Sequence, residues 1–181
     1  MGCDEAVLVS DRKFAGADTW ATSYTLAQAI KKTENFDIIL CGKQAMDGDT
    51  AQVGPGVAEK LDIPHIAYVK KIEKIENQSI QVERLMEDGY DVISSPIPCL
   101  LTVVKEINTP RLPSLRGMIF SKKAKIKHFT AQDIEADEDK IGINGSPTSV
   151  IKVFTPPRRK GGERITGEPD EQAMKLIASL K

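Results

Sequence analysis

The sequence predicts an α/β fold, with a doubly wound and mostly parallel sheet, a β-hairpin insertion and a C-terminal arm. Three observations support this prediction. Short apolar segments alternate with helical patterns over the first third of the chain. A stretch in which apolar and polar residues alternate comes next, as in a strand with one solvated face. Near the end, a segment rich in proline, glycine and cations precedes a short helical pattern.

The first third of the chain predicts three strands separated by two helices. In the first helix apolar residues recur at steps of three and four, and Asp18 or Thr19 suits its N-cap. Pro64 opens the third strand. The expected strands are residues 6–9, 38–41 and 66–69, and the expected helices are residues 20–32 and 53–61. Such alternation favours a parallel sheet with helices on both faces.

The middle of the chain predicts a hairpin followed by a buried strand. Residues 70–76 and 79–84 alternate apolar and polar side chains, and Asn77 and Gln78 suit the turn between them. Residues 99–104 are apolar and predict a strand that returns to the core. Pro110 and Pro113 indicate an exposed, stiffened loop over residues 108–114.

The C-terminal residues predict an arm outside the main domain. Residues 131–140 are acidic and weakly helical, and residues 155–162 have the composition of a linker. Pro169 suits the first position of a short helix. The helix has one apolar stripe, which we expect to pack against another surface. We therefore divide the chain into a nucleotide-binding α/β domain, residues 1–154, and a linker with an arm helix, residues 155–181, which packs on a partner subunit.

Composition excludes several classes of protein. The net charge of −1 gives no reason to expect nucleic acid or an anionic membrane as a partner. No apolar run approaches the roughly 20 residues that a spanning helix needs. The two histidines lie apart from the cysteines, so no metal site is predicted. Cys41 and Cys99 lie in apolar runs and indicate reduced, buried thiols, as expected in the cytoplasm.

The segment from residue 37 to residue 55 carries the strongest functional signal. An apolar strand runs into a turn of glycine and aspartate, and a new helix follows, with Thr50 at the expected N-cap. The first N–H groups of a helix are unpaired and carry the positive end of its dipole, which favours an anion. The side chains of Thr50 and Gln52 suit a pyrophosphate cradle. The segment therefore predicts a nucleotide site.

Three separated motifs, in the same order, resemble the β subunit of electron transfer flavoprotein. The first is the loop that begins Gly42-Lys43-Gln44-Ala45-Met46-Asp47. The second has a basic residue, Arg84, an acidic turn that ends at Gly89, and the segment 98–102. The third is the segment 107–115, which resembles the family's Asn-Glu-Pro-Arg segment and recognition loop, with Thr109 where the family often has glutamate. The resemblance covers essentially the whole chain and implies a Rossmann-like domain.

The resemblance implies a cofactor and partners. Such β subunits pair with an α subunit that carries FAD, and their own pocket holds AMP or, in the bifurcating branch, a second FAD that takes a hydride from NADH. The loop 47–55 and the run 102–108 look more like the bifurcating branch. No side chain needs to act in catalysis, because the flavin does the redox chemistry. The expected nucleotide contacts are Gly42, Lys43, Gln44, Asp47, Asp49, Thr50, Gln52, Val53 and Gly54.

Three of these contacts have an alternative role. A carboxylate repels phosphate, so Asp47 and Asp49 either order the loop or bind ribose hydroxyls. Lys43 either neutralises phosphate or is merely exposed.

The resemblance also implies a docking loop for a dehydrogenase of the acyl-CoA type. Leu115 matches the apolar anchor of the recognition loop, with Arg111 and Arg116 beside it. The alternative is that Leu115 is a core residue. Lysines 122, 123 and 125 follow, either as a basic patch for an acidic partner or as solvated surface.

Other functions fit less of the sequence. A non-redox nucleotide-binding module, like a stress protein, would explain the loop alone. An ATP-cleaving ligase domain normally needs a Ser-Gly-Gly-x-Asp-Ser loop, and this sequence contains none. Family members usually carry a further N-terminal segment, which forms a strand and part of the adenosine pocket. We therefore expect this chain to be a truncated family member, with the loss of its cofactor site as the remaining alternative.

Overall fold

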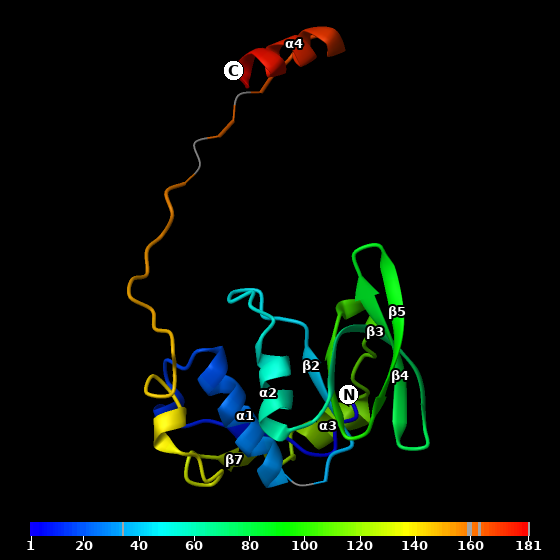
Figure 1. The fold of residues 1–181 in the computed structure, drawn as a ribbon, viewed down its shortest axis with the longest axis vertical. Coiled ribbons are helices and arrows are strands. Elements are labelled where there is room, and N and C mark those ends of the chain that lie inside the picture. The colour runs from blue at the N-terminus through cyan, green and yellow to red at the C-terminus, as the bar shows by residue number, and fades with distance from the viewer. Residues whose placement is uncertain (34, 159–160, 163, 181) are drawn as a thin grey trace. The chain divides into compact units, whose positions relative to one another are not determined.

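The computed structural model describes residues 1–33, 35–158, 161–162 and 164–180, and the chain divides into two compact units, Met1–Ser149 and Val150–Lys181. The first unit holds every strand of the described residues (Figure 1). Its elements, in order, are β1 (Val7–Val9), α1 (Thr19–Thr33), β2 (Ile38–Gly42), α2 (Val53–Leu61), β3 (His65–Glu76), β4 (Ser79–Met86), β5 (Gly89–Pro96), β6 (Cys99–Val103), α3 (Leu115–Ser121) and β7 (Lys127–Phe129).

The main sheet has five strands in the order β2-β6-β3-β4-β5. β6 pairs in parallel with β2 on one side and with β3 on the other, whereas β3, β4 and β5 pair antiparallel. This arrangement confirms the α/β class, in which parallel strands are connected through helices. The first expected strand lies elsewhere: β1 pairs in parallel with β7 in a separate two-stranded sheet. The three residues of β1 show the apolar pattern of a strand, but this pattern does not indicate which strand they pair with.

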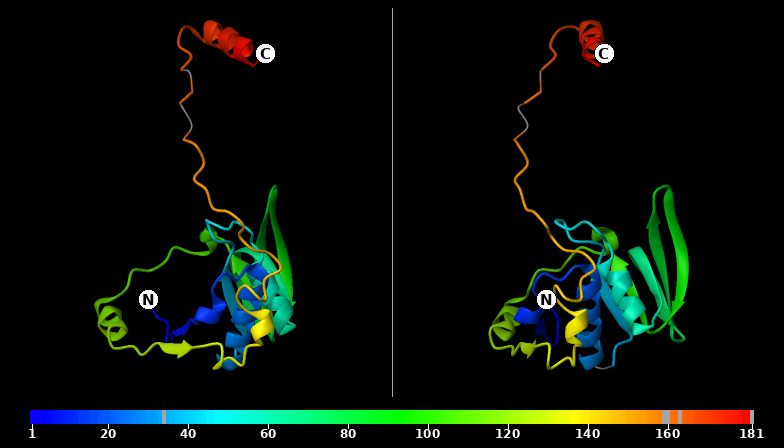
Figure 2. Two further views of the ribbon diagram at one scale, coloured as in Figure 1. Left: turned by 90° about the vertical axis from the view of Figure 1, so that its left-hand side faces the viewer. Right: turned by 60° about the vertical axis from the view of Figure 1, so that its left-hand side comes forward.

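Helices α1 and α2 pack side by side on one face of the main sheet (Figure 2). That face is built around Ala27 of α1, Val57 and Ala58 of α2, and Leu100 of β6. Small residues allow the close approach, since a Cβ at Gly56 would lie 2.5 Å from the Ser23 hydroxyl oxygen. We expected helices on both faces. In the described residues a second apolar cluster instead joins β3, β4 and β6, with Val69, Ile80, Val82 and Leu101 fully buried.

The expected hairpin is confirmed and is part of a larger meander. Asn77 and Gln78 both have positive φ, 51° and 56°, as the two-residue turn between β3 and β4 requires. β3 and β4 are longer than predicted, and β5 adds a third antiparallel strand that the sequence analysis missed. The side chains of β5 are mostly exposed, so its apolar alternation is too weak to predict a strand on its own.

The two helix starts differ in how well the sequence predicted them. Asp18 caps α1 as expected, because its Oδ1 accepts hydrogen bonds from the N–H groups of Trp20 and Ala21 at 2.9 and 3.1 Å. Thr50 does not cap α2, so this expectation was wrong. Gln52 takes that position, without a side-chain capping bond, because its Oε1 accepts from the Thr19 hydroxyl instead.

The later segments follow the sequence in part. Residues 108–114 form an exposed loop, as predicted, and residues 121–127 are exposed. Residues 131–140 form turns and a short 3₁₀ helix (Glu138–Lys140), not a weak α-helix, and they bury Ala131 and Ile134. All three cysteines are free thiols, and burial raises the pKa of Cys41 and of Cys99.

The second unit contains α4 (Pro169–Ser179). Pro169 begins the helix, as predicted, and Asp170 and Glu171 lie in its first turn. Its apolar side chains Met174, Leu176 and Ile177 are exposed. Helices as long and as apolar as a membrane crossing requires are absent from the described part of the chain.

Candidate functional site

The predicted loop begins at the carboxyl end of β2 and connects this strand to α2 (Figure 1, cyan). Gly42 is the last residue of β2, and the Lys43 N–H still donates to the Val103 carbonyl at 3.0 Å. Residues 43–50 are all exposed. Crevices at the carboxyl ends of parallel strands are the usual ligand sites of such sheets. The fold therefore presents the loop at the edge where a ligand is expected.

Hydrogen bonds inside the loop engage both of its carboxylates. Asp47 Oδ1 accepts from the Gly48 N–H at 2.9 Å, and Asp49 Oδ1 accepts from the Gln44 side chain. The Asp49 N–H donates to the Ala45 carbonyl at 3.1 Å. These bonds favour the loop-ordering role of Asp47 and Asp49. They also assign Gln44 to the loop's own scaffold.

The backbone ahead of α2 includes residues in the left-handed region, followed by a right-handed one. Asp49 and Ala51 have φ of 50° and 53°, and Gln52 is in the right-handed helical region. Alternation of left- and right-handed residues makes a nest, in which successive N–H groups point inward and attract anions. The first hydrogen bond of the helix runs from Gly56 to the Gln52 carbonyl at 2.9 Å, so the N–H groups of Val53 and Gly54 precede it. The nest and the helix dipole favour the same charge.

Gly54 has a packing role that the sequence analysis did not foresee. It is buried, and a Cβ at this position would lie 2.5 Å from Thr102 Cγ2, 3.6 Å from Leu100 Cδ2 and 3.7 Å from Cys41 Cβ. Glycine therefore lets the first turn of α2 lie directly on the sheet. Gly54 can contact a ligand only through its backbone N–H. Thr50 is exposed, and Gln52 is engaged with Thr19 through its side-chain oxygen.

Two residues near the loop were missed from sequence. Tyr68 of β3 has φ of 61°, and its N–H donates to the Thr102 hydroxyl oxygen at 3.1 Å. The Lys43 ammonium lies 5.0 Å from the centroid of the Tyr68 ring. A tyrosine in a strand and a threonine in an apolar run are ordinary β-formers, so neither gives a functional signal in the sequence.

The three residues of the predicted docking loop are all exposed. Leu115, at the start of α3, is 71% exposed, which is against a core role. Arg111 donates from Nε to the Met1 carbonyl at 2.9 Å, and Arg116 is exposed on α3. The docking role itself stays a prediction.

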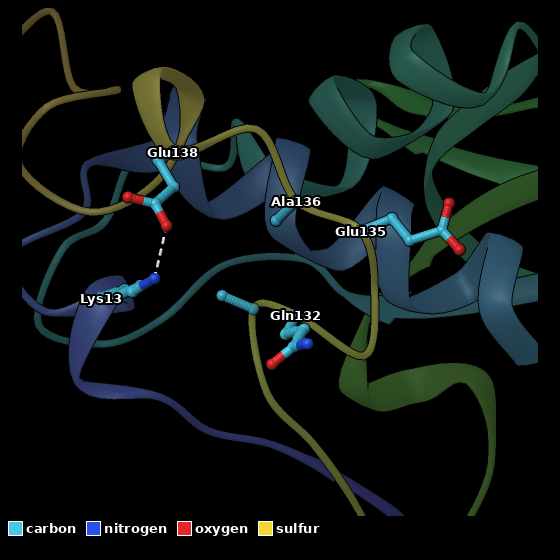
Figure 3. Close-up of a pocket in the computed structure, with 6 residues that line it drawn as sticks. Lys13, Gln132, Glu135, Ala136 and Glu138 are labelled. Carbon is cyan, nitrogen blue, oxygen red and sulfur yellow. Dashed lines mark hydrogen bonds and ion pairs between the residues drawn. The ribbon is translucent and has the colours of Figure 1, made fainter.

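A surface depression lies away from the loop, between the segment before α1 and residues 131–138 (Figure 3). Its cation, Lys13, is bound to Glu138 at 2.5 Å, and this ion pair raises the pKa of Lys13. Ala131, Gln132, Glu135 and Ala136 complete its lining. Since its positive charge is already paired with a carboxylate, it is poorly suited to a phosphate.

Comparison with known proteins shows which family the chain belongs to. The model of the electron transfer flavoprotein domain matches residues 1–134. The electron transfer flavoprotein subunit beta of Thermoanaerobacterium thermosaccharolyticum is 49% identical over 99% of this chain and 69% of its own length. This chain belongs to the electron transfer flavoprotein β-subunit family.

Two further relatives belong to assemblies with reductases. The caffeyl-CoA reductase-Etf complex subunit CarD of Acetobacterium woodii is 50% identical over 100% of this chain and 69% of its own length. The acryloyl-CoA reductase electron transfer subunit gamma of Anaerotignum propionicum is 42% identical over 99% of this chain and 70% of its own length. Membership in the electron transfer flavoprotein β family confirms the resemblance and the electron-transfer role. It does not support the alternative of a non-redox nucleotide-binding module.

Proposed function

We propose that this electron transfer flavoprotein β chain binds a dinucleotide, FAD, at the loop between β2 and α2. The observation that carries the proposal is the nest of N–H groups formed by residues 51–54, which lies near the carboxyl end of a parallel strand and opens a helix. Phosphate is the anion that this backbone cradle suits best. FAD is preferred to AMP because the loop 47–55 and the run 102–108 resemble the bifurcating branch.

The residues present offer several donors to a phosphate group. One carboxylate oxygen of Asp47 and one of Asp49 accept hydrogen bonds from donors of the loop itself. Val53 and Gly54 offer backbone N–H groups, Thr50 an exposed hydroxyl and Lys43 a positive charge. Gly42, at the end of β2, leaves open space above the strand, since a Cβ there would meet nothing within 4 Å.

When bound, the flavin supplies the redox chemistry, with NADH as the proposed hydride donor. The chain's part is to hold the phosphates and to orient the ring. The proposed partners are an electron transfer flavoprotein α subunit and a dehydrogenase of the acyl-CoA type, supported by the names of two relatives as subunits of CoA-ester reductase assemblies. We propose that the arm, residues 155–181, packs on the α subunit, because its apolar side chains are exposed. A reducing, cytoplasmic location fits its free thiols.

The test is the nucleotide content of the complex with the α subunit. Co-expressed and purified complex is denatured in acid, and released FAD and AMP are counted per heterodimer. Two FAD support the proposal. One FAD with one AMP would contradict FAD binding at this loop and indicate a plain electron carrier. One FAD with no second nucleotide would contradict the proposed nucleotide site itself.

A pair of variants at Ala51 tests the cradle itself. The positive φ of Ala51 suits glycine, whereas a β-branched residue strongly resists it. We expect Ala51→Gly to keep the second nucleotide and Ala51→Val to lose it, while the FAD of the α subunit is released equally from both. Equal retention in the two variants would contradict an N–H cradle at this loop.

A further inference from the structure

Tyr68 has a backbone conformation that tyrosine adopts rarely. Its φ is 61°, in the left-handed region where side chains of L-residues crowd the backbone. The β3–β6 register shifts between Ile66 and Val69, so the strand bulges at this residue. Bulges re-aim side chains and are frequent beside binding sites. A bulky residue retained in such a conformation is a reason to look for a function.

Thr102 holds this bulge to the nucleotide loop. The side chain is 2% exposed, and its hydroxyl oxygen accepts the Tyr68 N–H at 3.1 Å. Its methyl group lies under the first turn of α2, at the place where a Cβ on Gly54 would clash. One buried side chain therefore fixes both the start of α2 and the position of Tyr68. Through Thr102, Tyr68 is therefore connected to the first turn of α2, which carries part of the proposed phosphate cradle.

Lys43 brings a positive charge to the same place. Its backbone continues β2 through the hydrogen bond to Val103, and its ammonium lies 5.0 Å from the Tyr68 ring centroid. The Tyr68 side chain is half-buried, so part of its ring is open to solvent. A flat aromatic surface beside a cation and a row of N–H groups matches a ligand made of an aromatic ring and phosphates.

We propose that Tyr68 is a ring-contact residue of the nucleotide site and stacks on an aromatic ring of the bound nucleotide. This inference rests on the proposed function, because it takes the cradle of residues 51–54 as the phosphate site. The shared chemistry is a planar heteroaromatic ring. Within FAD that ring is either the isoalloxazine or the adenine, and the experiment separates the two.

The experiment compares Tyr68→Phe with Tyr68→Asn in the heterodimer. Asparagine tolerates positive φ, so it keeps the backbone and removes the ring. Stacking on an aromatic side chain is worth about 1–3 kcal/mol, or about 5- to 150-fold in affinity. We expect Tyr68→Phe to bind FAD like the wild type and Tyr68→Asn to bind it more weakly by a factor in that range. If the ring is isoalloxazine, Tyr68→Asn also loses flavin fluorescence quenching; if it is adenine, AMP affinity falls by the same factor and the flavin spectrum is unchanged.

Thermal unfolding separates a binding role from a core role. Tyr68→Gly relieves the positive φ, so the complex measured without a nucleotide in its β subunit should keep or raise its melting temperature, although the variant loses affinity. Tyr90 is the matched control, since the Lys70 ammonium lies 4.0 Å from its ring in the hairpin, away from the loop. Tyr90→Asn should leave FAD binding unchanged.

The failures can be told apart. Wild-type affinity in Tyr68→Asn, or an equal loss of affinity in Tyr90→Asn, overturns this inference alone. A marked fall of the melting temperature in both Tyr68→Asn and Tyr68→Gly, measured without that nucleotide, also overturns it, because the ring would then be part of the core. A wild-type complex that takes up neither FAD nor AMP in its β subunit overturns the proposed function and this inference with it.

Discussion

Replacing Gly54 by alanine tests how closely α2 must lie on the sheet. The added Cβ would lie 2.5 Å from Thr102 Cγ2, about 1 Å inside ordinary contact. Neither partner has room to move, because Gly54 is buried, Thr102 is 2% exposed, and Leu100 and Cys41 flank the new atom. Overpacking of this kind costs about 1–3 kcal/mol, against a helix-propensity gain of at most about 1 kcal/mol. We expect Gly54→Ala to lower the free energy of unfolding by about 1–2 kcal/mol.

A second substitution should reverse this loss. Thr102→Ser removes the clashing methyl group and keeps the hydroxyl oxygen that accepts the Tyr68 N–H. Alone it should cost about 1 kcal/mol, the usual price of one buried methyl group. In the double variant the new alanine methyl fills the space that the threonine methyl leaves. We therefore expect the double variant to lie within about 0.5 kcal/mol of the wild type.

The assay is urea unfolding of the full chain, followed by the fluorescence of its single tryptophan. Trp20 lies on α1 with the Lys60 ammonium of α2 3.6 Å from its ring, so its signal reports on α1–α2 packing. Gly48→Ala is the control, because a Cβ there meets nothing within 4 Å. A neutral Gly54→Ala, or a double variant whose loss equals the sum of the two single losses, would refute the close-packing argument.

The remaining predictions concern a cap, a half-buried arginine, the docking loop and the arm. Burial opposes ionisation of Asp18, but its hydrogen bonds, including those from Ala21 and Thr148, outweigh it and lower its pKa. Its stabilisation is therefore present above the unfolded pKa of about 3.9 and lost as pH falls through the folded value, so Asp18→Asn should lose less stability than the wild type between pH 5 and pH 3. Arg84 Nε is buried with no hydrogen-bond partner among the described residues, so Arg84→Met should keep or raise stability in urea; a loss above about 1 kcal/mol would contradict this. Leu115→Ala should slow electron delivery to a dehydrogenase with nucleotide content unchanged, and unaltered turnover would remove Leu115 as the anchor. Deleting residues 156–181 should abolish co-purification with the α subunit, and retained heterodimer would exclude the arm as the main contact.

The sequence predicts the elements of this fold better than their pairing. Strong periodicity located α1, α2 and the β3–β4 turn, because helical and strand periods are local properties. The partner of β1 and the third strand of the meander depend on contacts with distant residues, such as Lys127 to Phe129 for β1. The expected cap Thr50 failed for the same reason. Gln52 is engaged by Thr19, a residue that lies near it only after α1 and α2 have packed.

The candidate site was predictable where it is made of a continuous segment. The loop between β2 and α2, with its glycines and aspartates, was located from its local pattern alone. The role of Gly54 could not be resolved in this way, since a glycine in a loop motif equally suits ligand approach and helix packing. Tyr68 was not predictable at all, because its conformation arises from a bulge against β6.

These differences indicate how the site divides its tasks. In the proposed function the phosphate cradle uses main-chain N–H groups, so its geometry depends on φ at Ala51 more than on any side-chain chemistry. Discrimination between ligands then has to come from side chains that the rest of the fold positions, and the exposed part of the Tyr68 ring is the best placed of these among the described residues. Thr102 supports both parts through its two ends, the methyl group under Gly54 and the hydroxyl oxygen at Tyr68. A change at Thr102 that keeps only one of these contacts should therefore alter either the cradle or the ring contact, and not both.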